Sequence, residues 1–425
     1  MNLEQLALPV TLAWPLAAAA AWVLGELGHR WSGLPRVSFY GLVGFLLGHD
    51  QLGLLPDSHD PGLMLLANVA FGLVLFEFGH RIHLRWLVHN PWLALTGVLE
   101  ALLTLAAVTT LMQAFGQPLL TSLMVGSLAM ATSPAALMRV INERRAGGQV
   151  TERSLHLAAI DCVLAVVAFK LVLGLETYER LGSPWPALWN SAVVLLVSVA
   201  LGAVFGAAVP ALLRRTGRLT QDATVAFALG VLLLVALTHN LKFSPILATL
   251  TFGLVARHRR VVLTPTQRNF GALGDLLAVP LFMLVASMLS WQQALSGLAL
   301  GLGLLLVRAA VKLGVVSLLA RPAGIPLRKG VLTGVAMMPI SVFVILMLEQ
   351  SRVLGISFLD QAAPLAAATL LLELLGPVAV QWALTRAGET PAADPARGPA
   401  PPGLAPPAPA APAAAAPSPG AQHAA

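Results

Sequence analysis

The sequence predicts an all-α membrane protein of about thirteen transmembrane helices. Of its 425 residues, 57% are hydrophobic and only 11% are charged, whereas soluble domains usually carry roughly 25% charged residues. The mean hydropathy is +0.80, so a water-soluble fold would expose far too much apolar surface. The apolar runs also lack the period-two alternation of transmembrane β-strands, which leaves helices as the spanning elements.

Each predicted helix is an apolar run of a length suited to crossing a lipid bilayer. A hydrocarbon core of ~30 Å requires about 20 apolar residues in helical conformation. The runs that we assign as spans cover residues 6–27, 37–55, 61–82, 91–115, 118–141, 154–176, 186–213, 220–238, 243–258, 268–289, 292–320, 325–349 and 354–385. The ninth run is the shortest of them.

The basic residues alternate from loop to loop in a way that supports this segmentation. Twenty of the 26 Lys and Arg residues lie in the loops of one side, three lie in the opposite loops, and three lie inside spans. Because cytoplasmic loops are enriched in Lys and Arg, we expect a multi-pass protein of the cell (inner) membrane with its N-terminus outside and its C-terminus in the cytoplasm. The net charge of +7 then reflects topology and does not indicate a nucleic-acid partner.

The two ends of the chain differ from the apolar body. The N-terminus carries Glu4 and no basic residues, so we expect no cleavable signal peptide. Residues 391–425 hold 11 of the 30 prolines amid alanine and cannot bury a core. We therefore expect a transmembrane domain over 1–386 and a disordered Ala/Pro-rich cytoplasmic tail over 387–425. The single Cys162 excludes an internal disulfide.

Several ionisable residues are predicted to lie deep in the bilayer, where each charge costs ~2.5–3.5 kcal/mol. These residues are Glu77, Glu100, Asp161, Lys170, Arg308, Lys312 and Glu373. Asp161 lies in the middle of the sixth span, while Arg308 and Lys312 share one face of the eleventh. An ion pair between Asp161 and one of these basic residues would reduce the cost of burying both.

Two interpretations of this pairing stay open. The ion pair either locks two helices together, or it contains a carboxylate whose proton or cation occupancy changes during transport. Glu100, Lys170 and Glu373 are weaker candidates, because a helix-end position or a polar contact between helices explains each of them equally well.

Two predicted spans are interrupted by proline. The fifth contains Ala131-Thr132-Ser133-Pro134-Ala135, and the twelfth contains Met337-Met338-Pro339-Ile340-Ser341. Proline frees a backbone carbonyl one turn earlier, which a bilayer tolerates where the carbonyl is buried or lines a cavity; a simple kink is the alternative. Spans 1–6 and 8–13 then form two inverted six-helix repeats whose broken helices cross at the membrane midplane.

The chain as a whole resembles the monovalent cation/proton antiporter superfamily, the Na+/H+ exchanger fold. The patterns that carry the resemblance span most of residues 1–385 in order. They are LVLFEFGHRIHLRWL (73–87), SLAMATSPAALMRVINE (127–143), AAIDCVLAVVAF (158–169), LKFSPILATLTFGLVA (241–256), GDLLAVPLFMLVASML (274–289) and VRAAVKLGVVSLLARPAGIPLRKGVLTGVAMMPIS (307–341). The resemblance places Glu77 at the family's glutamate and implies a homodimer.

The resemblance also implies site residues, with departures from the family pattern. Relatives carry two adjacent polar residues on the sixth span, whereas Asp161 lies between Ile160 and Cys162. If Asp161 matches the second position, it is the cation- and proton-binding carboxylate; if it matches the first, it is the salt-bridge partner and Cys162 replaces the ion ligand. A family glutamate five residues earlier falls on His156.

The resemblance offers one basic residue on the eleventh span, and here two compete for the role. Lys312, within KLGVV, matches the family's lysine context slightly better than Arg308 does.

The leading functional hypothesis is exchange of a monovalent cation, Na+ or K+, for protons. Asp161 alternately binds a proton and a cation, and Thr132 and Ser133 with nearby carbonyls supply neutral oxygens suited to a hard cation. Movement of a six-helix core, formed by spans 4–6 and 11–13, past a scaffold of the other spans gives alternating access. We expect no enzymatic activity, no cofactor and no metal beyond the transported cation. The alternatives are a transport-inactive membrane sensor on the same scaffold and an organic-anion symporter of a related ten-helix type.

Two further features allow a bland and a functional interpretation. His80 and His83 flank Arg81 at the end of the third span, where they are either interfacial residues or a pH sensor. Glycine pairs one helical turn apart, Gly202 with Gly206 and Gly297 with Gly301, permit close helix packing, which we expect within one chain rather than between subunits.

Overall fold

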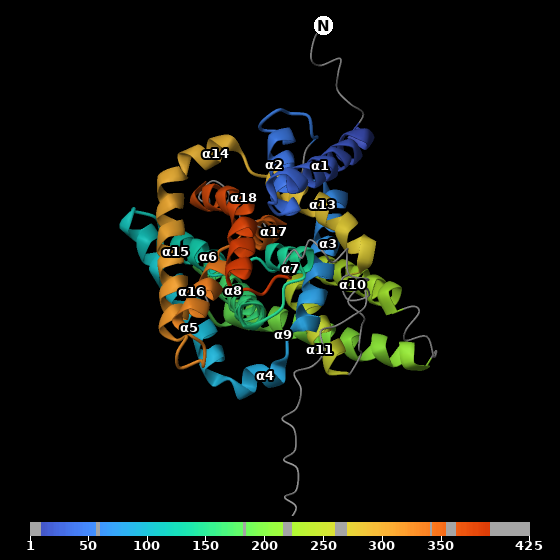
Figure 1. The fold of residues 1–425 in the computed structure, drawn as a ribbon. Coiled ribbons are helices and arrows are strands. Elements are labelled where there is room, and N and C mark those ends of the chain that lie inside the picture. The colour runs from blue at the N-terminus through green and yellow to red at the C-terminus, as the bar shows by residue number, and fades with distance from the viewer. Residues whose placement is uncertain are drawn as a thin grey trace, which may run out of the picture. The chain divides into compact units, whose positions relative to one another are not determined.

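The computed structural model describes residues 10–56, 60–181, 184–215, 223–259, 270–340, 342–353 and 363–391. These residues form helices and connecting segments, with no β-strand among them (Figure 1). Of the predicted disordered tail, 387–425, residues 387–391 belong to this described part and residues 392–425 lie outside it.

The helices follow one another in the order that the apolar runs predict. They are α1 (Val10–Ser32), α2 (Arg36–Leu47), α3 (Pro61–Arg81), α4 (Leu84–His89), α5 (Pro91–Ala114), α6 (Leu119–Ala129), α7 (Pro134–Arg144), α8 (Gln149–Leu181), α9 (Pro184–Arg215), α10 (Ala223–Asn240), α11 (Pro245–His258), α13 (Gly271–Ser287), α14 (Trp291–Ser296), α15 (Leu298–Leu318), α16 (Leu327–Ala336), α17 (Val342–Val353) and α18 (Ala363–Arg386).

Three helices, α3, α7 and α11, begin at an Asp-Pro or Ser-Pro pair whose first residue caps the helix. Proline suits the first helical position because its fixed φ matches the helix and its missing N–H would lack an intrahelical partner there. The residue before the proline then caps a backbone N–H of the first turn. These caps join Asp60 Oδ1 to Gly62 N in α3 (2.8 Å), Ser133 Oγ to Ala136 N in α7 (3.3 Å), and Ser244 Oγ to Leu247 N in α11 (3.4 Å).

Within the described residues, eight candidate spans are long and apolar enough to cross a bilayer, and one of them is the interrupted stretch Leu119–Arg144. Two further apolar helices are shorter, at Arg36–Leu47 and Leu273–Ser287. The protein is therefore a multi-pass helical membrane protein, and the count of thirteen spans stays a prediction. Two predicted spans have wrong boundaries. The span 37–55 ends at Leu47 in α2, and the span 292–320 is divided at Gly297 into α14 and α15. Gly297 is thus the N-cap residue of α15.

Both proline-containing stretches are interrupted in the structure. Helix α6 ends at Ala129 and α7 begins at Pro134, while α16 ends at Ala336 and α17 begins at Val342. The two interruptions touch, because Ser133 N donates a hydrogen bond to Pro339 O at 2.8 Å. In Figure 1, α7, α8 and α17 lie toward the centre of the view, with α5, α15 and α16 to one side.

Glycine brings α11 very close to its neighbours α3 and α9. A Cβ atom added at Gly253 would collide with the carbonyl of Phe76, and one added at Gly79 would collide with the carbonyl of Leu250. Each helix therefore supplies a glycine where the backbone of the other approaches. The predicted pair Gly202 and Gly206 on α9 also faces α11, so its close packing is within the chain.

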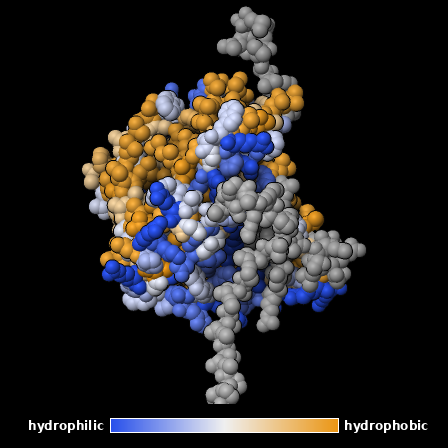
Figure 2. Space-filling view, in the orientation of Figure 1, coloured by the Kyte–Doolittle hydropathy of each residue, from blue (hydrophilic) through white to orange (hydrophobic). Residues whose placement is uncertain are grey.

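The outer surface of the helices is apolar where lipid would cover it. In Figure 2, apolar side chains gather over α14 and α15 at one edge, whereas hydrophilic side chains occupy the centre of this face. The exposed large hydrophobic residues of α15 are all leucines, namely Leu298, Leu302, Leu306 and Leu318. Exposed leucine on a long helix is typical of a bilayer-facing surface, since lipid tails are as apolar as leucine itself.

The first turn of α8 is capped by Glu389, a residue that is distant in the sequence. The Glu389 carboxylate accepts hydrogen bonds from Val150 N at 2.7 Å and from Thr151 N at 2.8 Å. A carboxylate at a helix N-terminus binds free N–H groups and interacts favourably with the helix dipole. Glu389 follows α18 directly, so it ties the end of α18 to the helix that carries Asp161.

Candidate functional site

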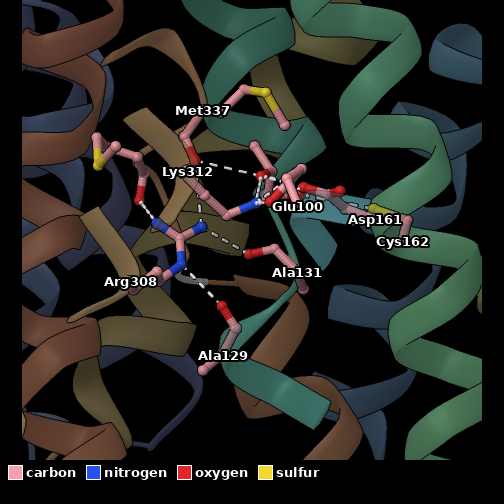
Figure 3. Close-up of polar contacts among 10 residues, drawn as sticks. Glu100, Ala129, Ala131, Asp161, Cys162, Arg308, Lys312 and Met337 are labelled. Atoms are coloured by element: carbon pink, nitrogen blue, oxygen red, sulfur yellow. Dashed lines mark hydrogen bonds and ion pairs between the residues drawn. The ribbon is translucent and has the colours of Figure 1, made fainter. Parts of the chain in front are cut away.

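A buried polar cluster lies where α5, α8 and α15 meet the interruption between α6 and α7. Its side chains are those of Glu100, Thr132, Asp161, Arg308 and Lys312, each at most 1% exposed. Figure 3 shows Arg308 and Lys312 reaching from α15 toward this point, with Glu100 and Asp161 on the opposite side of the Lys312 ammonium. Charged groups so far from water are costly, and the geometry shows how the cost is offset.

Asp161 is ion-paired with Lys312. The Lys312 Nζ atom lies 2.7 Å from Asp161 Oδ2, and the Thr132 hydroxyl lies 2.6 Å from the same oxygen. Of the two basic residues that the sequence offers to Asp161, the structure thus brings Lys312 to it. The Thr132 side chain can reach Asp161 because residues 130–133 are not helical and turn it toward α8.

Glu100 is the second carboxylate of this cluster, although the sequence ranks it among the weaker candidates. Both of its oxygens lie 2.9 Å from Lys312 Nζ, and the side chain is 0% exposed. Helix-end snorkelling is therefore the wrong explanation for this residue. The sequence holds a signal for it, because Thr96, Glu100 and Thr104 form a polar stripe at helical spacing within the apolar first three-quarters of this helix.

Arg308 binds the backbone of both interrupted helices. Its guanidinium donates hydrogen bonds to four carbonyl oxygens, those of Ala129 (2.7 Å), Ala131 (2.9 Å), Met337 (3.1 Å) and Met338 (2.7 Å). These carbonyls lie at or just beyond the C-terminal ends of α6 and α16, where the helix dipole is negative and a cation is favoured. The five N–H donors of arginine suit this role.

This arrangement changes the expected set of cation ligands. The sequence predicts that carbonyls freed near Pro134 would face a cation, but two of the carbonyls there, Ala129 O and Ala131 O, bind Arg308. The Thr132 carbonyl accepts a weak hydrogen bond from Cys162 Sγ at 3.5 Å. By contrast, Asp161 Oδ1 is buried and has no hydrogen-bond partner among the described residues. It is the open oxygen of the cluster.

Two other predicted site residues have structural contacts. The Ser133 hydroxyl caps α7 and, unlike the Thr132 hydroxyl, has no described contact with Asp161. His156 lies one to two turns before Asp161 on α8. Its Nδ1 lies 2.7 Å from Glu152 O, its Nε2 accepts from His83 N at 3.1 Å, and its ring packs edge-on to Trp86. Both ring nitrogens thus contact backbone groups.

The other ionisable residues predicted to lie deep in the bilayer have no described contact with this cluster. Glu77 on α3 pairs with Arg81 at 3.2 Å and accepts from Asn142 on α7 at 2.9 Å. Lys170 is buried on α8, where its carbonyl accepts from Ser191, and Glu373 is buried on α18 close to Gly41. Among the described residues, no group of three or more His, Cys, Asp or Glu side chains could hold a metal ion.

His83, one of the two histidines of the suggested pH sensor, lies just before α4 and contacts the Arg257 guanidinium of α11 through its Nε2. Although the residue as a whole is exposed, partial burial of the imidazole, and then the positive charge of Arg257, lower its pKa below the ordinary 6.5. Neutral His83 is therefore favoured in the folded protein. The stability that this contact contributes is present above pH 6.5 and is lost as the pH falls through the lowered pKa.

If the protein exchanges cations for protons, as hypothesised from its sequence, we expect His83→Gln to leave the pH profile of that flux unchanged above pH 6.5. In more acidic buffer the parent should lose thermal stability more steeply than the variant, because only the parent then acquires a charge beside Arg257. Flux and melting temperature measured across the same pH series test both statements. A displaced pH profile above 6.5 in the variant would instead make His83 a sensor of neutral pH.

Comparison with known proteins agrees with the helical architecture. The family model described as the transmembrane sodium/hydrogen exchanger matches residues 16–386. A structure of the sodium proton antiporter MjNhaP1 from Methanocaldococcus jannaschii at pH 8 is similar with a TM-score of 0.60 and 16% identity, covering 89% of this chain and 96% of that one. An electron-microscopy structure of MjNhaP1 gives a TM-score of 0.64 and 16% identity, covering 91% and 97%. At such identity the likeness is one of fold.

Proposed function

Since this chain belongs to the sodium/hydrogen exchanger family, we propose that it exchanges a monovalent cation, Na+ or K+, for protons across the membrane. The observation that carries the proposal is the state of the Asp161 carboxylate. It is fully buried among membrane helices, it is ion-paired with Lys312, and its Oδ1 has no hydrogen-bond partner in the described part of the chain. A purely structural ion pair has no need of such an open oxygen.

Asp161 performs the coupling by binding one ligand at a time. A proton on the carboxylate removes the negative charge that attracts a cation, and a bound cation disfavours the proton, so the two exclude one another. Exclusive occupancy of one site that faces the two sides of the membrane in turn is sufficient for exchange. The Thr132 hydroxyl supplies a neutral oxygen beside the carboxylate, which suits a hard monovalent cation.

The role of Asp161 corresponds to the second position of the family's paired motif. In this assignment Asp161 is the binding carboxylate itself, and Ile160 occupies the first position. The Cys162 thiol is directed to the Thr132 carbonyl, and its soft sulfur is a poor ligand for Na+ or K+. Ser133 acts through the cap of α7 and holds the interruption in shape.

We extend the proposal to the arrangement of the chain in the membrane. The interruptions at 130–133 and 337–341 occupy corresponding places in two inverted six-helix repeats. The Lys and Arg bias of the loops favours an outer N-terminus and a cytoplasmic C-terminus. Assembly as a homodimer rests on the family resemblance.

The direct test is cation-driven proton movement in vesicles that contain the purified full chain and a pH-sensitive dye. An inward gradient of Na+ or K+ should raise the internal pH, and reversing the gradient should reverse the change. Choline chloride of equal concentration controls for osmotic effects, and protein-free vesicles control for leakage. If neither Na+ nor K+ moves protons at any pH, the transport proposal fails and the chain is a transport-inactive member of its family.

A further inference from the structure

An open groove of about 440 Å³ lies between α5 and α15. Both helices are long and apolar enough to cross a bilayer, so the groove lies at the depth of the lipid tails. Several of its lining residues are small, namely Ala106, Ala107, Ala310 and Gly314. A Cβ atom added at Gly314 would meet nothing within 4 Å, so the small residues leave unfilled space between the two helices.

The lining of the groove suits an apolar chain. Its one polar side chain is that of Thr110, whose hydroxyl donates to Ala106 O at 2.8 Å and needs no further partner. On α15 the lining extends from Ala310 to Leu318, a rise of about 12 Å along the helix. This length is close to the hydrocarbon thickness of one leaflet, about 15 Å. An unfilled groove would also forfeit dispersion contacts that a lipid tail can make.

Two contacts show that α5 and α15 run in opposite directions. Glu100, in the first half of α5, pairs with Lys312 in the second half of α15 at 2.9 Å. Leu111, near the end of α5, lies within 3.6 Å of the Cβ position of Gly303 near the start of α15. The start of α5 and the end of α15 therefore lie at the same end of the helix pair.

Two exposed arginines occur at this end. Arg85 belongs to α4, directly before α5, and Arg321 lies one turn beyond Leu318, where the groove ends. Neither side chain has a hydrogen bond or ion pair with another described residue, whereas the nearby Arg328 donates to Arg386 O at 3.0 Å. The loop charges favour this end as cytoplasmic, and anionic lipids make the cytoplasmic surface of a membrane negative.

We propose that the groove binds one acyl chain of a phospholipid with an anionic headgroup, and that Arg85 and Arg321 bind the headgroup. Such a lipid joins an apolar chain to a negative charge, as the groove joins an apolar lining to two cations without a described counter-charge. Arginine suits the phosphate because its planar N–H donors match the phosphate oxygens. The bound chain supports, from the lipid side, the two helices that carry Glu100 and Lys312. This inference is independent of the proposed exchange.

Photolabelling in vesicles that contain the full chain identifies the occupant. The probes are phosphatidylglycerol and phosphatidylcholine, each with a diazirine halfway along one acyl chain, added in trace amounts to phosphatidylcholine vesicles. Mass spectrometry of peptides after irradiation locates the label. We expect the anionic probe to label the peptides of α5 and α15 about tenfold more than the zwitterionic probe does, because the two arginines attract the net negative charge.

Two variants separate the groove from the headgroup site. Gly314→Leu fills the groove and should reduce labelling of α5 and α15 by the anionic probe about tenfold. Arg85→Gln combined with Arg321→Gln leaves the groove open, so labelling by the anionic probe should fall to the level of the zwitterionic one. Ala208→Leu is the matched control, because this exposed residue of α9 receives the same added bulk away from the groove. Its labelling should equal that of the parent.

Three results would overturn the proposal. Equal labelling of α5 and α15 by the two probes in the parent would exclude recognition of an anionic lipid. Labelling that survives Gly314→Leu would place the lipid outside the groove. A disulfide-linked dimer of Gly314→Cys after oxidation would place a second copy of the chain there, since the only native cysteine, Cys162, is buried. If Gly314→Leu fails to fold, the comparison of the two probes in the parent still decides.

Discussion

Replacing Asp161 with asparagine should reduce cation-coupled proton flux to the level of protein-free vesicles. Asparagine keeps the shape of the side chain but has neither a negative charge nor a titratable proton, so it can bind neither of the exchanged ions. The fold should survive, because Lys312 keeps both of its hydrogen bonds to Glu100 and no buried cation is left unpaired. Flux in the vesicle assay and the melting temperature in detergent measure the two effects separately.

Asp275→Asn is the matched control for this variant. The Asp275 side chain is 84% exposed and pairs with Arg139 at 2.6 Å, so the same chemical change occurs at a carboxylate outside the buried cluster. We expect it to retain parental flux. If Asp161→Asn exchanges cations for protons at the parental rate, the coupling carboxylate lies elsewhere, and Glu100 is the next residue to replace, followed by Glu77.

Replacing Arg308 with methionine should destabilise the protein by about 3 kcal/mol or more, since each buried carbonyl that loses its donor costs about 1–3 kcal/mol. The carbonyls that lose their described side-chain donor belong to Ala129, Ala131 and Met338, whereas Met337 O still accepts from the Thr132 hydroxyl at 3.2 Å. Methionine preserves much of the side-chain length and packing but donates no hydrogen bond. We expect the melting temperature in detergent to fall by about 5 °C or more, or the variant to fail to yield monodisperse protein.

A lysine at position 308 separates charge from geometry. Lysine restores the positive charge, but its three N–H donors radiate from one point and cannot satisfy four carbonyls, so it should recover only part of the lost stability. Arg30→Met is the control, because Arg30 is 70% exposed and pairs with Glu26 on the surface. Such a pair contributes at most about 1 kcal/mol. An Arg308→Met protein with the same melting temperature as the parent would show that the interrupted helices are stable without this guanidinium.

The features that the sequence predicts well are those imposed directly by the bilayer. Apolar length predicts where the long helices lie, because a span must cover the hydrocarbon core. Proline predicts both interruptions, since it cannot donate its backbone hydrogen bond. The cost of a buried charge singles out Asp161, Arg308 and Lys312 as residues that need partners.

The ion-pair partners of these residues depend on which helices pack together, and the sequence alone does not reveal this packing. Glu100 and Lys312 lie 212 positions apart, and only the packing of α5 against α15 brings them together. Lys312 and Arg308 share a helix face, and the resemblance favours Lys312 only slightly as the partner of Asp161. Their roles differ because Arg308 lies beside the ends of α6 and α16 while Lys312 lies a turn farther on. Ser133 and Thr132 differ in the same way, since the shape of the interruption decides which hydroxyl points to α8.

The reciprocal glycines of α3 and α11 have a mechanical consequence. With Gly79 and Gly253 each seated against a carbonyl of the opposite helix, a slip of one helix by a single residue would press a Cβ atom into the backbone. The two helices therefore behave as one rigid unit, and α9 belongs to the same unit through the close contacts of Gly202 and Gly206 with α11. In the proposed exchange, any sliding of helices that exposes Asp161 to the two sides of the membrane must then take place along other helix boundaries. Paired labels on α3 and α11 should accordingly keep a constant separation while the protein is exchanging ions.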